Sequence, residues 1–89
     1  MLSQKIKIIN KLGLHARASM KLVNLANKYQ SEIILLFKGR EVNAKSIMNI
    51  MVLGASCGNE IEVRISGEDE NIAMENIVEL FERRFDEEE

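Results

Sequence analysis

The chain has 89 residues, a length that predicts a single domain spanning residues 1–89. Hydrophobic residues make up 46% of it, and no apolar run approaches the length of a membrane span. The first ten residues alternate lysine with isoleucine and lack the apolar region of a signal peptide, so we expect a cytoplasmic protein. One histidine and one cysteine exclude an internal disulfide bond and a conventional structural zinc site, and we expect neither a metal nor a cofactor.

The net charge of −2 conceals a difference between the two halves of the chain. Residues 1–45 carry a charge of +7, whereas residues 46–89 carry −9. A basic half suits docking to acidic proteins or to anionic groups. The same lysines would also serve as ordinary solvated surface charges, and for most of them this is the favoured interpretation.

The first expected strand covers residues 5–10, because isoleucine and lysine alternate there and point to opposite faces. A loop over residues 11–14 follows, and its Gly13 permits a backbone geometry that other residues resist. From Ala16 to about Lys28 no residue breaks a helix, and apolar residues recur at spacings of three or four. This pattern predicts a helix with one buried face. Its expected members are Ala18, Met20, Leu22, Val23, Leu25, Ala26 and Tyr29.

His15, the only histidine, immediately precedes this helix. Unpaired backbone N–H groups and the positive end of the helix dipole make such a place a ready anion site. The guanidinium group of Arg17 can add charged donors to it. A neutral imidazole beside several anion donors suits a side chain that accepts a phosphoryl group. By themselves, however, these residue types favour a plainer interpretation, in which the histidine caps the helix and the arginine is a solvated surface charge.

Residues 32–37 are rich in β-formers, and the pair Lys38-Gly39 separates them from a short strand expected over residues 40–43. A two-residue connection that ends in glycine favours a tight hairpin. This is the clearest antiparallel signal in the sequence.

A short helix is expected next, over residues 47–53. The hydroxyl group of Ser46 can cap its beginning, and Gly54 can end it. Because almost every residue in this helix is apolar, some of its side chains should reach the surface. Met48 and Met51 lie at helical spacing and have adaptable thioethers, which suits a docking patch, although two core methionines would show the same pattern.

Residues 60–66 alternate apolar and polar side chains throughout and predict the most secure strand. Gly67 ends it, and Asp69 is expected to cap a last helix from about residue 70 to residue 85. Residues 86–89 are expected to form a frayed, solvated tail. The apolar face of the last helix is expected to contain Ala73, Ile77, Leu80 or Phe81, and Phe85.

The expected order of elements is therefore β-α-β-β-α-β-α. Strands with one polar face, together with three helices, predict an α+β, open-faced, two-layer sandwich in which a four-stranded antiparallel sheet is covered on one face by three helices. No constellation typical of an enzyme is present: His15 and Cys57 could form a nucleophilic pair, but nothing in the sequence orients them. Phosphate-binding and dinucleotide-binding loops are absent as well.

The string Gly13-Leu14-His15-Ala16-Arg17 resembles the active-site signature of the HPr family, the histidine-containing phosphocarriers of the bacterial phosphoenolpyruvate-dependent phosphotransferase system. The resemblance continues over residues 39–48 and covers nearly the whole chain. It implies the same sandwich fold and a carrier rather than an enzyme. It also implies that enzyme I, with phosphoenolpyruvate as donor, phosphorylates Nδ1 of His15, and that the group then passes to an enzyme IIA component. Arg17 and the backbone amides of Ala16 and Arg17 would hold the phosphate.

The resemblance assigns roles to the second helix as well. Ser46 matches the position that an ATP-dependent kinase, the HPr kinase/phosphorylase, modifies in many bacteria. The family's docking patch matches Ile47, Met48, Met51 and Gly54. In many members a proline stands where this chain has Ala18, a good helix former that adds an N–H donor to the first turn.

Two other classes of function stay open beside the carrier. One is a purely regulatory protein-binding module controlled at Ser46, and phosphorylation by enzyme I and phosphoenolpyruvate would separate it from a carrier. The other is a small nucleic-acid-binding domain that uses the basic half, but the acidic half and the shortage of aromatic residues argue against it. We expect a monomer that neither inserts into a membrane nor binds nucleic acid.

Overall fold

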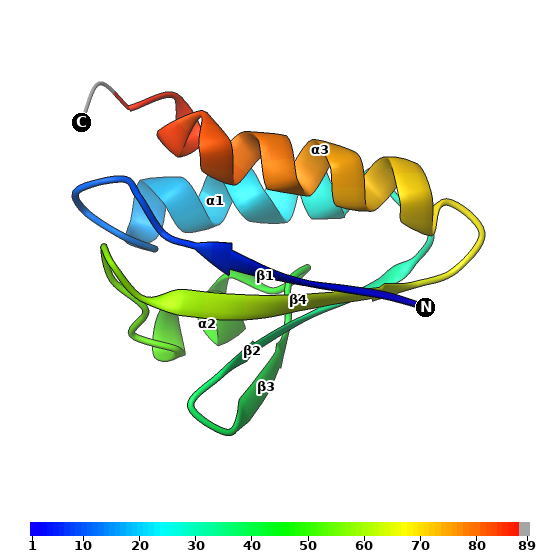
Figure 1. Ribbon diagram of the computed structural model, residues 1–89, viewed down its shortest axis with the longest axis horizontal. Coiled ribbons are helices and arrows are strands. Elements are labelled where there is room, and N and C mark those ends of the chain that lie inside the picture. The colour runs from blue at the N-terminus through cyan, green and yellow to red at the C-terminus, as the bar shows by residue number, and fades with distance from the viewer. Residues whose placement is uncertain (88–89) are drawn as a thin grey trace.

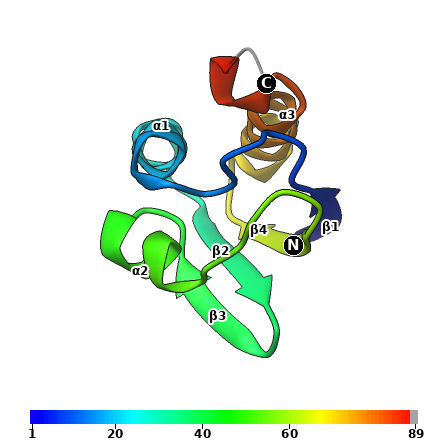
Figure 2. The same ribbon diagram turned by 90° about the vertical axis from the view of Figure 1, so that its left-hand side faces the viewer.

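The computed structural model describes residues 1–87, which form one four-stranded antiparallel sheet with three α-helices on one of its faces (Figures 1 and 2). The predicted α+β open-faced sandwich is thereby confirmed. No helix in these residues is both long enough and apolar enough to cross a membrane. The elements in chain order are β1 (Leu2–Lys7), α1 (Ala16–Ala26), β2 (Glu32–Phe37), β3 (Arg40–Asn43), α2 (Ile47–Val52), β4 (Glu60–Ser66), α3 (Glu70–Glu82) and a short C-terminal turn (Arg84–Asp86).

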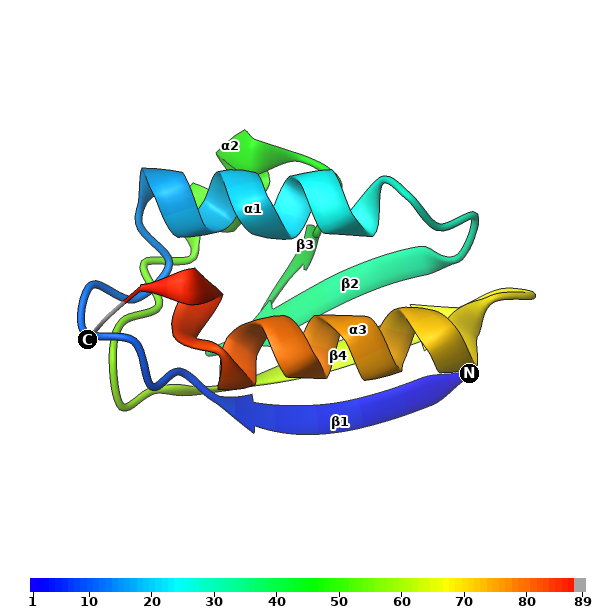
Figure 3. The same ribbon diagram turned by 90° about the horizontal axis from the view of Figure 1, so that it is seen from above.

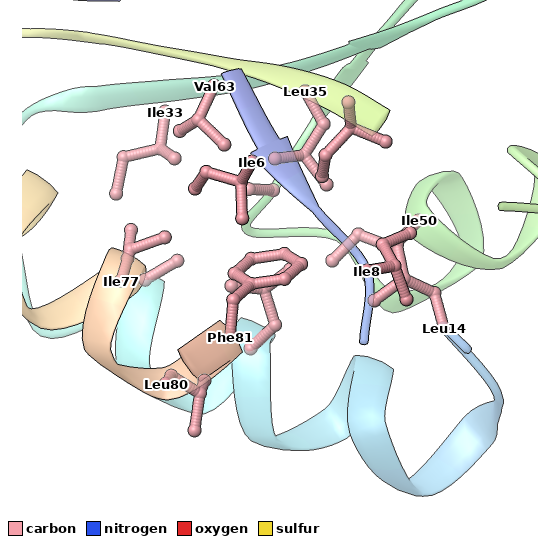
Figure 4. Packing of buried hydrophobic residues seen from close by; sticks show 14 of the residues in the cluster. Ile6, Ile8, Leu14, Ile33, Leu35, Ile50, Val63, Ile77, Leu80 and Phe81 are labelled. Atoms are coloured by element: carbon pink, nitrogen blue, oxygen red, sulfur yellow. The ribbon is translucent and has the colours of Figure 1, made fainter. Parts of the chain in front are cut away.

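The core lies between the covered face of the sheet and the helices. The strand order is β1-β4-β2-β3, so β4 and β2 are the central strands, and they contribute more buried side chains than the two edge strands. Figure 4 shows Ile33 and Val63 of the sheet facing Ile77 and Phe81 of α3. Burying each such side chain stabilises the fold by about 1.5–3 kcal/mol, which is why the alternation in these strands settles which face is covered.

The first strand begins and ends earlier than its sequence pattern predicts. β1 covers residues 2–7 instead of 5–10, because it pairs with β4 from Leu2 opposite Ile65 to Lys7 opposite Glu60. The length and register of the partner strand β4 set the first and last residues of β1. The alternation of side chains within β1 carries no information about these limits. The expected faces are nevertheless correct, since Ile6 and Ile8 are both buried.

Helix α1 ends at Ala26, two residues before the expected end. Ala18 and Leu22 are buried as predicted, whereas the prediction for Met20 is wrong, because 55% of that residue is exposed. A residue two positions from Ala18 and two from Leu22 lies about 200° around the helix from each of them, so all three cannot share one face.

The hairpin is confirmed. β2 and β3 have the predicted limits, and Lys38 and Gly39 have φ angles of 51° and 79°. Two successive positive φ angles are typical of a type I′ turn, whose twist matches that of the flanking strands.

Helix α2 is capped as expected. The hydroxyl oxygen of Ser46 accepts a hydrogen bond from the backbone N–H of Asn49 at 3.5 Å. The helix ends at Val52, one residue before the expected end, and the next residue, Leu53, is its C-cap. Its buried side is formed by Ile50 and Leu53.

Helix α3 begins at Glu70 as expected, but its N-terminal capping and its C-terminal end differ from the prediction. Asp69 precedes it, but its carboxylate does not cap the helix and accepts instead from the backbone N–H groups of Gln30 at 2.8 Å and Ser31 at 3.0 Å. The carboxylate thus fixes the entrance to β2. The helix also ends at Glu82, three residues before Phe85. Every residue of the expected apolar face is buried, including Phe85.

The expectation of a frayed tail is wrong for Asp86 and Glu87. Arg84, Phe85 and Asp86 have φ angles of 56°, 55° and 63°, so the chain turns left-handed directly after α3. This turn brings Phe85 into the core, where its ring packs edge to face against that of Phe81 with the ring centroids 4.8 Å apart. Residues 88–89 of the expected tail lie outside the described residues.

Candidate functional site

The loop between β1 and α1 holds His15 in a defined position. The Asn10 side-chain amide donates to the backbone oxygen of Gly13 at 2.8 Å, and the Gly13 N–H donates to the backbone oxygen of Asn10 at 3.1 Å. Gly13 has a φ of +64°, and a Cβ at this position would lie 2.7 Å from Cα of Ser56. The site therefore needs glycine at residue 13 for two separate reasons, the backbone conformation and the close approach of another segment.

His15 is the N-cap of α1. Its backbone is extended, with φ −75° and ψ 179°, and its ring nitrogen Nδ1 accepts a hydrogen bond from the N–H of Arg17 at 3.3 Å. The side chain is 27% exposed. The structure therefore places the imidazole where the sequence predicts it, at the amino end of the helix and open to solvent on one side.

The first turn of α1 supplies the donors around this ring. The N–H groups of Ala16, Arg17 and Ala18 have no carbonyl partner within the helix, which is true of the first residues of any α-helix. The guanidinium group of Arg17 is exposed and forms no ion pair within residues 1–87. A small anion bound beside Nδ1 would meet backbone donors, the positive helix end and this charge together.

The sequence pattern does not identify two residues of the site, Asn10 and Glu87. The carboxylate of Glu87 contacts Nε2 of His15, and its other oxygen accepts from the side-chain amide of Asn10 at 3.2 Å. Glu87 lies within an acidic run that resembles a solvated tail, so no local signal identifies it. Burial raises the pKa of Glu87, but the hydrogen bonds from His15 and Asn10 and the charge of Lys21 lower it more, so this pKa lies below its ordinary value.

The residues of the expected docking patch lie on α2 and directly after it. Met48 is 72% exposed and Met51 is 43% exposed, whereas Ile47 is half-buried. The patch is joined to the His15 loop, because the N–H of Leu14 donates to the backbone oxygen of Ala55 at 3.1 Å. Figure 2 shows the start of α1, the helix α2 and the C-terminal turn at the same end of the sandwich.

Other exposed apolar residues lie outside the expected patch. Leu12 lies in the His15 loop, Met20 lies on α1 and Val52 is the last residue of α2. Gly54 is exposed, and Ser46 is half-buried at the start of α2. No cluster of three or more histidine, cysteine, aspartate or glutamate side chains that could hold a metal ion occurs in residues 1–87.

Comparison with known proteins gives one consistent answer. A family model described as "PTS HPr component phosphorylation site" matches residues 2–83. The phosphocarrier protein HPr of Xylella fastidiosa is 59% identical over 87 residues, which are 98% of each chain. A crystal structure of HPr from Thermoanaerobacter tengcongensis is 44% identical, covers 100% of both chains and superposes with a TM-score of 0.96.

A second crystal structure from Thermoanaerobacter tengcongensis is described as an HPr dimer. It is 44% identical, covers 98% of this chain and 100% of the other, and has a TM-score of 0.79. Dimers therefore occur among the structural neighbours of this chain, although we expected a monomer from its sequence. From the match over residues 2–83 and the identity to its relatives, we conclude that this chain belongs to the HPr family and is a phosphocarrier of the phosphotransferase system, a carrier rather than a catalyst.

Proposed function

We propose that His15 is the residue of this phosphocarrier that receives and releases the phosphoryl group, and that Nδ1 is the atom that bonds to phosphorus. The observation that carries this proposal is the hydrogen bond from the N–H of Arg17 to Nδ1, because it places a lone pair at the amino end of α1. In the transfer, this lone pair attacks phosphorus and the N–P bond forms, while the bond from phosphorus to the donor breaks and its electron pair leaves with the donor.

The phosphate oxygens would then be held by the groups that now surround Nδ1. The N–H groups of Ala16 and Arg17 would donate to them, and the Arg17 guanidinium would add a charged, planar donor. Since this end of the helix is open to solvent, the cradle is incomplete and the partner protein supplies the remaining charge. A carrier needs this balance, because a site that bound the group too tightly would not release it.

Enzyme I, charged by phosphoenolpyruvate, would be the donor, and enzyme IIA components would be the acceptors. Both would dock on the apolar surface that includes Ile47, Met48, Met51 and Gly54. The basic first half of the chain supports acidic partner surfaces, since opposite charges speed encounter and fix orientation. The whole chain, residues 1–89, would act as one cytoplasmic domain, without cofactor, metal or nucleic acid. The working form would be a monomer, and sedimentation of the unlabelled chain against concentration would detect a dimer.

Phosphorylation of Ser46 by an HPr kinase/phosphorylase would regulate this exchange. Its hydroxyl already caps α2, and a phosphate at a helix start is compatible with the fold because the helix dipole favours negative charge there. The modification would therefore act by repelling acidic partner surfaces and not by unfolding the domain. A folded Ser46→Asp variant should accept phosphoryl groups from enzyme I more slowly, and a normal rate would count against this mechanism.

The decisive experiment for the carrier role is incubation with enzyme I and labelled phosphoenolpyruvate. The wild-type chain should gain one acid-labile phosphoryl group, Arg17→Ala should gain it more slowly, and His15→Ala should gain none. A His15→Ala variant that still becomes labelled would contradict the proposal. A wild-type chain that stays unlabelled would favour the alternative, a purely regulatory module controlled at Ser46.

A further inference from the structure

The two ring nitrogens of His15 have different partners, and together these partners select one tautomer. An ionised carboxylate can only accept hydrogen bonds, so the contact between Nε2 and Glu87 requires the proton to be on Nε2. On the other side, Nδ1 accepts from the N–H of Arg17 and therefore carries a lone pair. We propose that Glu87 is a positioning residue for phosphoryl transfer, which keeps the His15 ring in the Nε2–H tautomer and stabilises the positive charge that the ring acquires when Nδ1 bonds to phosphorus. This proposal rests on the proposed function of His15.

The carboxylate of Glu87 is itself held in place. Asn10, which is fully buried, donates from its side-chain amide both to Glu87 at 3.2 Å and to the backbone oxygen of Gly13 at 2.8 Å. The Glu87 side chain is only 15% exposed. The chain of contacts from Asn10 through Glu87 to His15 resembles the arrangement in which a buried polar group orients a carboxylate and the carboxylate orients a histidine.

The C-terminal turn brings Glu87 to this position. Its three residues, Arg84, Phe85 and Asp86, all have positive φ, and for residues with a Cβ each such conformation costs about 1–2 kcal/mol. Such a turn persists only where its surroundings determine it. Here the ring of Phe85 is buried, and Nζ of Lys21 on α1 donates to the backbone oxygen of Phe85 at 2.7 Å. Figure 3 shows the result, in which the chain leaves α3 and turns back toward the start of α1.

The chemistry of the transfer explains what a carboxylate does at this place. When the Nδ1 lone pair forms the N–P bond, the ring keeps its proton on Nε2 and becomes positively charged. The hydrogen bond from Nε2–H to Glu87 is then charged on both sides and strengthens as the transition state forms. Glu87 lies at the nitrogen remote from the incoming group, so its charge faces the ring and not the phosphate. The contact should therefore speed phosphorylation and favour the phosphorylated ring.

Two substitutions separate orientation from charge. Glu87→Gln keeps a carbonyl oxygen that can accept from Nε2–H but removes the charge, whereas Glu87→Ala removes both. Glu82→Gln is the matched control, because it removes one exposed negative charge at the last residue of α3, and Glu82 forms no hydrogen bond or ion pair with His15. All three changes lie outside the apolar core, and the amide spectra of β2 and β4 verify that each variant is folded.

The first readout is the ring itself, in unphosphorylated protein with ¹⁵N-labelled histidine. Wild type and Glu82→Gln should show the Nε2–H tautomer, with a slowly exchanging Nε2–H proton. In Glu87→Ala this proton should exchange fast, and the nitrogen shifts should move toward a mixture of tautomers. A merely structural role of Glu87 would leave both signals unchanged.

The second readout is the rate of phosphoryl transfer from phosphorylated enzyme I. Glu82→Gln should match wild type, Glu87→Gln should be slower, and Glu87→Ala should be slowest, by about tenfold, as expected for the loss of a hydrogen bond to a charged group. An unchanged ring spectrum, or an unchanged transfer rate, in folded Glu87→Ala would overturn the inference. The failure of the proposed function is a different result, namely labelling of His15→Ala, and the ring spectrum does not depend on it.

Discussion

At the scale of single residues, a phosphocarrier must hold its group firmly enough to form the bond and loosely enough to pass it on. In the proposed role, His15 would meet both demands, because one ring nitrogen lies among the donors at the helix start while the other contacts the carboxylate of Glu87. The backbone N–H groups cost nothing to organise, since the helix leaves them without partners in any case. The loop that positions the His15 ring, in contrast, needs specific residues, and its most constrained position is Gly13.

Replacing Gly13 with alanine should lower the free energy of unfolding by about 2–4 kcal/mol, because the positive φ and the clash with the segment of Ser56 both oppose a Cβ. The matched control is Gly54→Ala. Gly54 has nearly the same φ, +66°, but a Cβ there would meet no atom within 4 Å, so only about 1 kcal/mol should be lost. Chemical denaturation of both variants measures the difference. Equal losses would show that the close approach to Ser56 has no energetic effect.

At the scale of elements, the parts of the fold that were predicted correctly are those whose signals are local. β4 was predicted to the residue because alternation, a preceding loop and Gly67 mark it, and the hairpin was predicted because Lys38-Gly39 can adopt only a few turns. The limits of β1 were missed because a partner strand far along the chain sets them. Glu87 was missed for the same reason, since its contact with His15 spans 72 positions.

The C-terminal turn yields a prediction about stability. Because Arg84 has a φ of 56°, Arg84→Gly should relieve strain, and this gain should match or exceed the entropic cost of glycine, for a net change of about 0 to +1 kcal/mol in the free energy of unfolding. In Glu82→Gly, at the last residue of α3, glycine should instead cost about 0.5–1 kcal/mol. Thermal or urea unfolding compares the two. A loss in Arg84→Gly as large as that in Glu82→Gly would show that the turn is not left-handed in solution.

The hydrogen bonds of Asp69 connect the start of β2 to the start of α3. They should make the free energy of unfolding depend on pH in the acidic range. The Ser31 hydroxyl, followed by the backbone N–H groups of Gln30 and Ser31, holds the pKa of Asp69 below its ordinary value of 3.8. Asp69 therefore stabilises the fold fully above that ordinary value, and its contribution is lost as the pH falls from there through the lowered pKa. Asp69→Asn should lower stability at neutral pH and flatten the decline in acid, measured by denaturation between pH 2 and pH 6. Glu68→Gln, an exposed neighbour, should leave the decline as it is in wild type.

At the scale of the whole molecule, the sandwich gathers three segments that lie far apart in the sequence. The His15 loop, the region around α2 and the C-terminal turn meet at one end (Figure 2). Local motifs in the sequence indicated the first two segments, but they could not show that Leu12, Met20 and Val52 are exposed. Exposure depends on which helix faces the tertiary contacts leave uncovered, and that is a property of the assembled fold.

The exposed apolar patch on α2 should determine recognition by partners and not the chemistry of transfer. Met48→Asp should raise the KM of phosphorylated enzyme I for this carrier by about tenfold or more, because a charge would have to be buried in an apolar contact, while kcat changes little. Ile72→Asp is the control, since Ile72 is also exposed but lies on α3. Steady-state transfer assays measure KM and kcat for both variants. Equal effects of both substitutions would contradict a docking role for α2.

The proposed transfer depends on which ring nitrogen of His15 bonds to phosphorus, and a coupling between phosphorus and nitrogen identifies that atom directly. Protein with ¹⁵N-labelled histidine is phosphorylated by enzyme I and phosphoenolpyruvate, and its ³¹P spectrum is recorded. We predict a single phosphorus resonance split by one-bond coupling to Nδ1 of His15, and none in His15→Ala. Coupling to Nε2, or a phosphorus signal without any coupling to histidine nitrogen, would contradict the account.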